Sequence, residues 1–217
     1  MNFMGAPMIS WTIGAALSSK LFERVLVSTD DEEIADVSNS YGADVPFLRG
    51  KAVDDYSPVS LATVAALRQS QSYWGKSFDT VVQLMANCPL RAASDITQAL
   101  ENFEKHRKAY PFQISCFRYG WMNPWWATEL SAAGEPMRLF PEALSKRSQD
   151  LPDLFCPTGA IWVADTKQLL AEETFYGPRH RFDPMPWQSA VDIDDGDDLA
   201  FAEALGSMIY PQPSQAF

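Results

Sequence analysis

The sequence predicts an α/β fold with a mostly parallel sheet and helices on both faces. Short β-branched segments alternate with segments of helical periodicity along most of the 217 residues. Repeated strand–helix units of this kind pack as parallel strands joined by crossover helices. With 47% hydrophobic and 12% aromatic residues, the chain can bury a sizeable core. Its length fits a single domain over residues 1–217.

The expected strands are short apolar runs rich in β-branched residues. The segment RVLVS is typical, because polar residues bound a compact apolar centre. Runs of this length and composition are characteristic of buried strands. The expected strands are 24–28, 45–48, 80–85, 112–117, 159–164 and 188–193.

The expected helices carry apolar side chains at helical spacing. In the first, Ile9, Ile13 and Ala16 share one face. Acidic residues open the second helix at the positive end of its dipole, and Gly42 is suited to end it. The expected helices are 8–19, 30–41, 58–73, 94–108, 167–173 and 198–208.

Residues 119–158 break this alternation. Proline, glycine and tryptophan are frequent there and no hydrophobic period is clear. We interpret the segment as a small loop-rich insertion. Its three tryptophans can pack internally, form an interface or line a sugar pocket.

Charge and cysteine usage exclude several classes of protein. The chain has 17 Lys and Arg against 28 Asp and Glu, a formal net charge of -11. An acidic surface repels phosphate backbones, so we expect no nucleic-acid partner, although a local site can still hold a small phosphorylated substrate. No apolar run reaches the roughly 20 residues of a membrane span, and Met1–Pro7 lacks the basic region of a secretory signal. Three widely spaced cysteines indicate neither a disulfide framework nor a zinc site, and we expect a cytoplasmic protein.

The strongest local motif is Asp192-Ile193-Asp194 at the end of the last expected strand. Alternate residues of a strand point the same way, so the two carboxylates can face one point while Ile193 enters the core. Two close carboxylates repel unless a cation lies between them, and Mg²⁺ suits such oxygen ligands. Spacing alone slightly favours the alternative, a solvated acidic loop that caps the last helix.

A second motif is RSQDLP at 147–152. Arg147 offers a planar fork for a carboxylate or phosphate, and Gln149 can both donate and accept. The alternative is a surface ion pair. No GxGxxG, GxxxxGK[ST], HExxH or GxSxG motif occurs, so dinucleotide-binding, P-loop, zinc-protease and serine-hydrolase interpretations lose their main support.

Seven segments taken in order resemble those of the acylneuraminate cytidylyltransferases, the CMP-sialic acid synthetases and their relatives. The segments are GAPMISWTI, RVLVSTDDEEIADV, YGADVPFLR, ANCPLR, RSQDLP, PTGAIWV and DIDDGDD, and they span about residues 5 to 205. The resemblance implies a Rossmann-like nucleotidyltransferase core. It also implies transfer of CMP from CTP to the 2-hydroxyl of a nonulosonic sugar acid, with release of pyrophosphate.

The resemblance also assigns roles to residues. Asp192 and Asp194 would hold Mg²⁺ and, together with Arg147, would form the catalytic group. Substrate-binding positions implied by the matching segments are Arg49, Ser57 and Ser60 near the cytidine, Arg147 and Gln149 near the sugar acid, and Asn87 and Thr158. The insertion would form a homodimer and close over the sugar. A role in lipopolysaccharide or capsule biosynthesis is implied as well.

The chain departs from the family pattern at three places. The family begins with a strand and a phosphate-binding loop of the type ARxGSKxxxxKN, about twenty residues by ordinary element lengths, and this element is absent before GAPMISWTI. Met85 stands where sialic-acid enzymes often have a glutamine. Cys156-Pro157-Thr158 replaces a segment that often contains arginine and asparagine. The identity of the sugar acid, N-acetylneuraminate or another, therefore stays open at the level of sequence.

Two other functions remain open at the level of sequence. Without the phosphate loop, the chain can be an impaired or non-catalytic cytidylyltransferase-like protein. It can also be a related transferase for another 2-keto sugar acid, such as 3-deoxy-manno-octulosonate.

Overall fold

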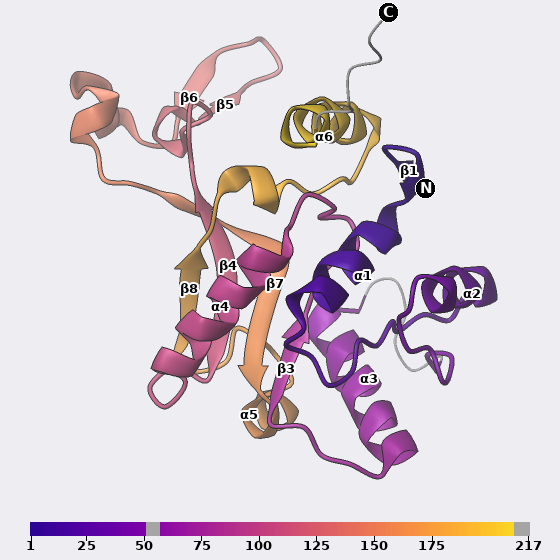
Figure 1. The fold of residues 1–217 in the computed structure, drawn as a ribbon. Coiled ribbons are helices and arrows are strands. Elements are labelled where there is room, and N and C mark those ends of the chain that lie inside the picture. The colour runs from indigo at the N-terminus through magenta and orange to yellow at the C-terminus, as the bar shows by residue number, and fades with distance from the viewer. Residues whose placement is uncertain (51–56, 211–217) are drawn as a thin grey trace, which may run out of the picture.

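A four-stranded mixed sheet forms the centre of the molecule (Figure 1). The computed structural model describes residues 1–50 and 57–210. The strand order is β3 (Thr80–Gln83), β7 (Phe155–Asp165), β4 (Phe112–Arg118) and β8 (His180–Pro184).

The expectation of a mostly parallel sheet is wrong. Strand β7 runs antiparallel to both β3 and β4, and only β4 and β8 are parallel. The cause is the connection between β4 and β7. It leaves and re-enters the sheet at the same end, as in a hairpin, whereas a crossover helix would have restored the parallel direction.

Helices cover both faces of the sheet, as expected. On one face, α3 (Val59–Trp74) and α5 (Thr166–Glu172) contribute to a core built around Phe112, Ile114 and Trp162. On the other face, α4 (Ala93–His106) packs Ile96, Ala99 and Phe103 against Ile161 and Val163. Helix α1 (Met8–Ser19) contacts α4 on this second face.

Two further helices complete the set predicted from the sequence. Asp31 caps α2 (Glu32–Ser40) by accepting from the Ile34 N–H at 3.0 Å. Asp195 caps α6 (Gly196–Ile209) by accepting from the N–H groups of Asp197 and Asp198. Helix α6 packs on the hairpin β1 (Asn2–Phe3) and β2 (Ala6–Pro7), with Phe3 fully buried. Each of the helices starts and ends within two residues of its expected bounds.

Three expected strands are wrong. Segments 24–28 and 45–48 contact each other only through one isolated bridge, between Leu26 and Asp44. Neither segment joins the central sheet, because no described strand connects the segment 24–28 to β3. Segment 188–193 forms the short helix η4 (Trp187–Ala190) and a loop. The strand at this edge is β8, which the sequence analysis missed because HRFDP is charged and ends in proline.

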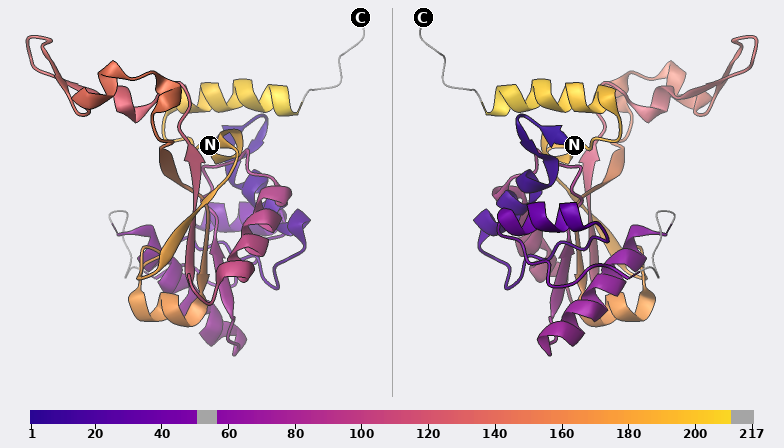
Figure 2. Two further views of the ribbon diagram at one scale, coloured as in Figure 1. Left: turned by 90° about the vertical axis from the view of Figure 1, so that its left-hand side faces the viewer. Right: turned by 90° about the vertical axis from the view of Figure 1, so that its right-hand side faces the viewer.

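The segment between β4 and β7 forms an arm that projects from the body (Figures 1 and 2). It contains η1 (Pro124–Trp126), β5 (Thr128–Leu130), β6 (Pro136–Arg138), η2 (Pro141–Ser145) and η3 (Ser148–Asp150). This arm occupies the place of the expected insertion, but it ends before Phe155, where β7 begins. No helix within residues 1–50 and 57–210 is long and apolar enough to cross a membrane.

A large cavity, here called the central trough, lies beside β3. Its volume is about 910 Å³, and it is bounded by α1, α3, β3 and the segment 21–28. The trough separates β3 from the segment 24–28, which explains why that segment does not join the sheet.

Candidate functional site

The two aspartates of the DIDDGDD segment lie in the loop between η4 and α6. Between them, Ile193 is only 4% exposed and belongs to the core under α6. The Ile193 N–H donates to the carbonyl of Asn87 at 2.9 Å. Buried Ile193 thus anchors the loop and leaves Asp192 and Asp194 at the surface, as the alternation predicted.

The loop after β3 meets this aspartate pair. Asn87 Nδ2 donates to Asp194 Oδ1 at 3.0 Å. Partial burial raises the pKa of Asp192, and the carboxylates of Asp194 and Asp198 raise it further. The fold therefore brings together two segments that are more than 100 residues apart in the sequence, ANCPLR and DIDDGDD.

These side chains fit a magnesium ion. Two neighbouring carboxylates that repel each other are stabilised by a divalent cation, and Mg²⁺ prefers such oxygen ligands. In the described part of the chain, no group of three or more His, Cys, Asp or Glu side chains is placed to hold a metal. Asp192 and Asp194 would therefore hold the ion together with substrate and water oxygens, as is usual for Mg²⁺.

Arg91 is buried beneath the loop after β3 and supports it. The sequence analysis did not single out this residue. Its side chain is 1% exposed and donates to the carbonyls of Met85 and Ala160 and to Thr12 Oγ1. Burial lowers its pKa to about 10. The only sequence signal was a lone arginine at the end of an otherwise uncharged loop, ANCPLR.

The expected cytidine residues lie around the first turn of α3 and the trough. Arg49 lines the trough and pairs with Asp30 at 2.7 Å. Ser57 precedes α3, and Ser60 within it is buried and accepts from the Phe175 N–H at 3.3 Å. The Ser60 hydroxyl is thus engaged in holding the segment after α5.

Thr158 lies on β7 and is 7% exposed. Its hydroxyl donates to the Ala190 carbonyl at 3.2 Å, so it ties β7 to η4, just before the aspartate pair. The neighbouring Cys88 is fully buried, and this burial raises its pKa to about 12. Both side chains lie beneath the aspartate loop.

Arg147 and Gln149 lie elsewhere, on the projecting arm (Figure 2). Arg147 makes a two-pronged ion pair with Asp150, at 2.7 and 2.9 Å, and this carboxylate raises the pKa of Arg147. The fold of one chain therefore groups Asn87, Asp192 and Asp194, but leaves Arg147 and Gln149 on a separate part of the molecule.

Residues 1–148 match the family model described as Cytidylyltransferase. The chain belongs to the cytidylyltransferase family. The pseudaminic acid cytidylyltransferase of Campylobacter jejuni is 32% identical over 207 residues, which cover 94% of this chain and 87% of that protein. The N-acylneuraminate cytidylyltransferase A of Danio rerio is 31% identical over 202 residues, which cover 92% of this chain and 44% of that protein.

The fold of this cytidylyltransferase is also similar to that of a solved enzyme. A CMP:2-keto-3-deoxy-manno-octonic acid synthetase, solved in complex with CTP, has a TM-score of 0.65 and 14% sequence identity, covering 96% of this chain and 91% of that one. The resemblance to the acylneuraminate cytidylyltransferases is confirmed, and with it the enzyme class, a nucleotidyltransferase.

Proposed function

We propose that this cytidylyltransferase transfers CMP from CTP to a nonulosonic, sialic-acid-like sugar acid and releases pyrophosphate. The observation that carries the proposal is the junction between Asn87 and Asp194, which joins two segments of the family pattern at one carboxylate pair. The substrate class is supported by the names of the matched relatives, which are cytidylyltransferases for pseudaminic acid and for N-acylneuraminate.

In the proposed reaction, the 2-hydroxyl oxygen of the sugar acid attacks the α-phosphorus of CTP. The bond from that phosphorus to the leaving pyrophosphate breaks, and the hydroxyl proton is released to solvent water. Asp192 and Asp194 would hold Mg²⁺, which would offset the negative charge that develops on the phosphates. Asn87 fixes the orientation of Asp194 through its 3.0 Å hydrogen bond.

The substrate-binding roles expected from the sequence are part of the same proposal. Arg49, Ser57 and Ser60 would lie on the cytidine side, and Thr158 would support the site from β7. Arg147 would orient the sugar carboxylate through its planar guanidinium, and Gln149 would add a polar contact. For the arm residues to reach the aspartate pair, a second copy of the chain or a movement of the arm is required.

A homodimer through the arm is therefore also proposed. The arm exposes large apolar side chains, with Trp121 87%, Leu130 71% and Met137 60% exposed. Exposed apolar patches of this kind are typical of interaction surfaces. The expected location in the cytoplasm and a role in the biosynthesis of surface polysaccharides remain predictions.

Pyrophosphate release tests the reaction. It is measured with CTP, Mg²⁺ and a panel of sugar acids that includes pseudaminic acid and N-acetylneuraminate. Asp194→Asn removes one of the two negative charges expected to hold the cation, so the rate should fall by about 100-fold or more. The free energy of unfolding should change little, because Asp194 is exposed.

Asp197→Asn is the matched control. Asp197 lies three residues further on, in the first turn of α6, and its carboxylate takes no part in the cap. This variant should keep the wild-type rate. Equal losses in both variants, or none in Asp194→Asn, would contradict the assignment of the aspartate pair.

A further inference from the structure

Arg91 is a buried cation whose hydrogen bonds, within the described part of the chain, go to no carboxylate. Its side chain is 1% exposed and donates to two main-chain carbonyls and to the hydroxyl of Thr12. Its Nε atom is buried and has no partner among the described residues. Buried charges are costly and are usually paired with an opposite charge. A buried cation that is held only by neutral groups therefore requires an explanation.

One branch of hydrogen bonds leads from Arg91 to Asp194. The guanidinium donates to the Met85 carbonyl from both Nη atoms, at 3.3 Å each. Two residues further on, Asn87 donates from Nδ2 to Asp194 Oδ1 at 3.0 Å, and its carbonyl accepts from the Ile193 N–H at 2.9 Å. Because Met85 and Asn87 belong to one short loop, holding the Met85 carbonyl restricts the position of Asn87 and, through it, that of Asp194.

A second branch leads from the same guanidinium to Asp192. Arg91 Nη1 donates to the carbonyl of Ala160 on β7. The Ala160 N–H donates to Thr158 Oγ1 at 3.3 Å, and that hydroxyl donates to the Ala190 carbonyl at 3.2 Å. Ala190 ends η4 and lies two residues before Asp192. The two branches thus begin at one side chain and end at different aspartates.

The shape of the guanidinium suits this arrangement. It reaches acceptors on three elements, which are α1 through Thr12 at 2.8 Å, the loop after β3, and β7. A planar fork holds several acceptors in fixed directions, whereas the ammonium group of a lysine is a point charge on a flexible stem. An apolar side chain of similar volume would avoid the cost of burying a charge, but it would leave the buried carbonyls unpaired.

We propose that Arg91 is a positioning residue of the aspartate pair: by holding the loop after β3 and strand β7 in a fixed relation, its guanidinium sets the separation of Asp192 and Asp194. Two carboxylates can share one Mg²⁺ only in a narrow range of geometry, because this ion requires short bonds in a near-octahedral arrangement. The inference rests on the proposed function, in which the pair holds the cation, but its first test needs neither cation nor turnover.

The side-chain amide of Asn87 reports on the first branch in the protein without ligands. Its Nδ2 protons give signals in ¹H–¹⁵N spectra, which are assigned by their loss in Asn87→Ser. In Arg91→Met, the proton bonded to Asp194 should shift upfield, because the loop is no longer held and the hydrogen bond weakens. Arg91→Lys keeps the charge but not the fork, so it should show the same shift, smaller in size. An unchanged signal in Arg91→Met, or a wild-type signal in Arg91→Lys, would overturn the positioning role.

Binding of the Mg²⁺–CTP complex tests both branches. It is measured by isothermal titration calorimetry without a sugar acid. Arg91→Met should raise the Kd about tenfold or more, as is typical when a group that orients a metal ligand is removed. Thr158→Val breaks only the second branch, so it should also raise the Kd while leaving the Asn87 signal unchanged. A wild-type Kd in Thr158→Val would show that the second branch has no role, and the proposal would fail.

Loss of stability alone should not produce these effects, and Gln113→Leu is the matched control. Gln113 is also 1% exposed, and its hydrogen bonds connect β4 with α4 and β8, which contribute to neither branch. Urea unfolding should show a lower midpoint for this variant, as for Arg91→Met. The Asn87 signal and the Kd of Mg²⁺–CTP should nevertheless remain those of the wild type. The same changes in the control would reduce Arg91 to a structural residue.

Turnover separates this inference from the proposed function. With CTP, Mg²⁺ and a sugar acid, Arg91→Met should lower kcat about tenfold or more and leave the KM of the sugar acid nearly unchanged, because neither branch reaches the arm. A wild-type chain that releases no pyrophosphate, but whose Asn87 signal responds to Arg91→Met, would refute the reaction and keep the positioning role. An active chain whose Arg91→Met variant matches it in every measurement would refute the positioning role alone.

Discussion

The two edges of the central sheet differ in their side chains. At one edge, β8 has the sequence HRFDP, with three ionisable residues and a terminal proline. At the other edge, β3 has the sequence TVVQ and no charge. Charged residues and proline are the usual protection of an edge strand against further pairing, whereas an apolar edge invites another strand. The comparison indicates that β8 is protected as an edge strand, whereas β3 lacks such protection.

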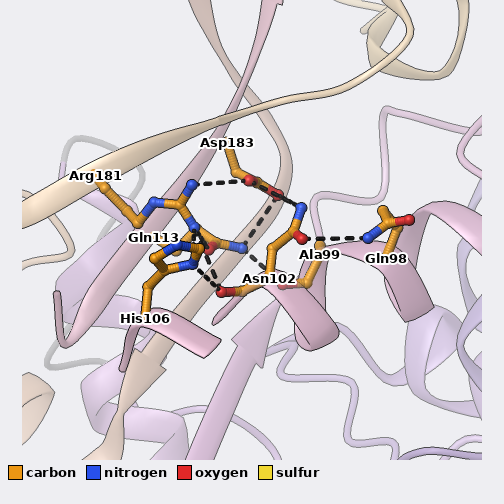
Figure 3. Close-up of polar contacts among 7 residues, drawn as sticks. All are labelled: Gln98, Ala99, Asn102, His106, Gln113, Arg181 and Asp183. Carbon is orange, nitrogen blue, oxygen red and sulfur yellow. Dashed lines mark hydrogen bonds and ion pairs between the residues drawn. The ribbon is translucent and has the colours of Figure 1, made fainter. Parts of the chain in front are cut away.

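The polar side chains near the two edge strands, β8 and β3, differ in whether they have hydrogen-bond partners. Near β8, Asp183 accepts from Asn102 Nδ2 at 3.2 Å and from Gln113 Nε2 at 3.3 Å, and Arg181 donates to Gln113 Oε1 at 2.8 Å (Figure 3). His106 adds a 3.1 Å contact to Arg181. We call these residues the β8 polar cluster. On β3, by contrast, Gln83 Oε1 is buried without a partner within the described residues.

The largest expected difference is in the free energy of unfolding when a glutamine is replaced by leucine, either Gln113 near β8 or Gln83 on β3. Gln113→Leu removes hydrogen bonds to the Ala99 carbonyl, Asp183 and Arg181. It should lower the free energy of unfolding by about 2–3 kcal/mol, because buried partners lose their hydrogen bonds. Gln83→Leu removes an unpaired buried oxygen and should be neutral or stabilise by about 1 kcal/mol. Urea unfolding of the 217-residue chain measures both, and equal losses would remove the distinction between the edges.

A smaller effect is expected in the pH dependence of stability. Burial raises the pKa of Asp183, although Asn102, Arg181 and His106 act in the opposite direction. The folded protein then binds this proton more tightly than the unfolded chain does. The contribution of Asp183 to stability is therefore greatest below its unfolded pKa of about 3.9 and falls as the pH rises through the folded pKa.

Asp183→Asn isolates this contribution. From about pH 3.9 upward, the variant should gain stability relative to the wild type, until the pH passes the folded pKa of Asp183. Urea unfolding at closely spaced pH values measures the difference between the two proteins. A difference of the opposite sign would mean that Arg181 determines the ionisation of Asp183 more strongly than its burial does.

The smallest effect concerns the thiols. Burial raises the pKa of Cys88 to about 12 and that of Cys116 to about 11. Both side chains are at most 1% exposed, whereas Cys156 is partly accessible. Iodoacetamide at neutral pH should therefore alkylate Cys156 first. If Cys88 reacts much faster than Cys116, the side of the molecule that contains β3 opens more often than the side that contains β8.

Sequence periodicity was sufficient to predict the helices, and it failed where pairing partners decide the outcome. The apolar stripe of α3 and the Asp31 cap of α2 are local signals, and both helices formed where expected. The segment 24–28 has the composition of a strand, but it has no neighbour on its trough side. Strand β8 has a polar sequence, yet it pairs with β4 along its whole length. Strand formation depends on neighbours that are distant in the sequence, so composition alone misjudges it.

The candidate site was predictable to a similar degree. Alternation placed Ile193 in the core and Asp192 and Asp194 at the surface, and the family pattern pointed to Asn87. The pairing of Arg147 with Asp150 corresponds to the surface ion pair that remained open as an alternative. Arg91 could not be found in this way, because its burial depends on three elements that meet only in the folded chain.

Arg91 also has a consequence for how the protein moves. One guanidinium holds α1 through Thr12, the loop after β3 through Met85, and β7 through Ala160. A fluctuation that released the loop would remove the hydrogen bonds from this buried cation to Met85, which is costly in free energy. Opening of the loop should therefore cost more free energy than opening of a loop without such an anchor, which favours a stable support beneath the aspartate pair.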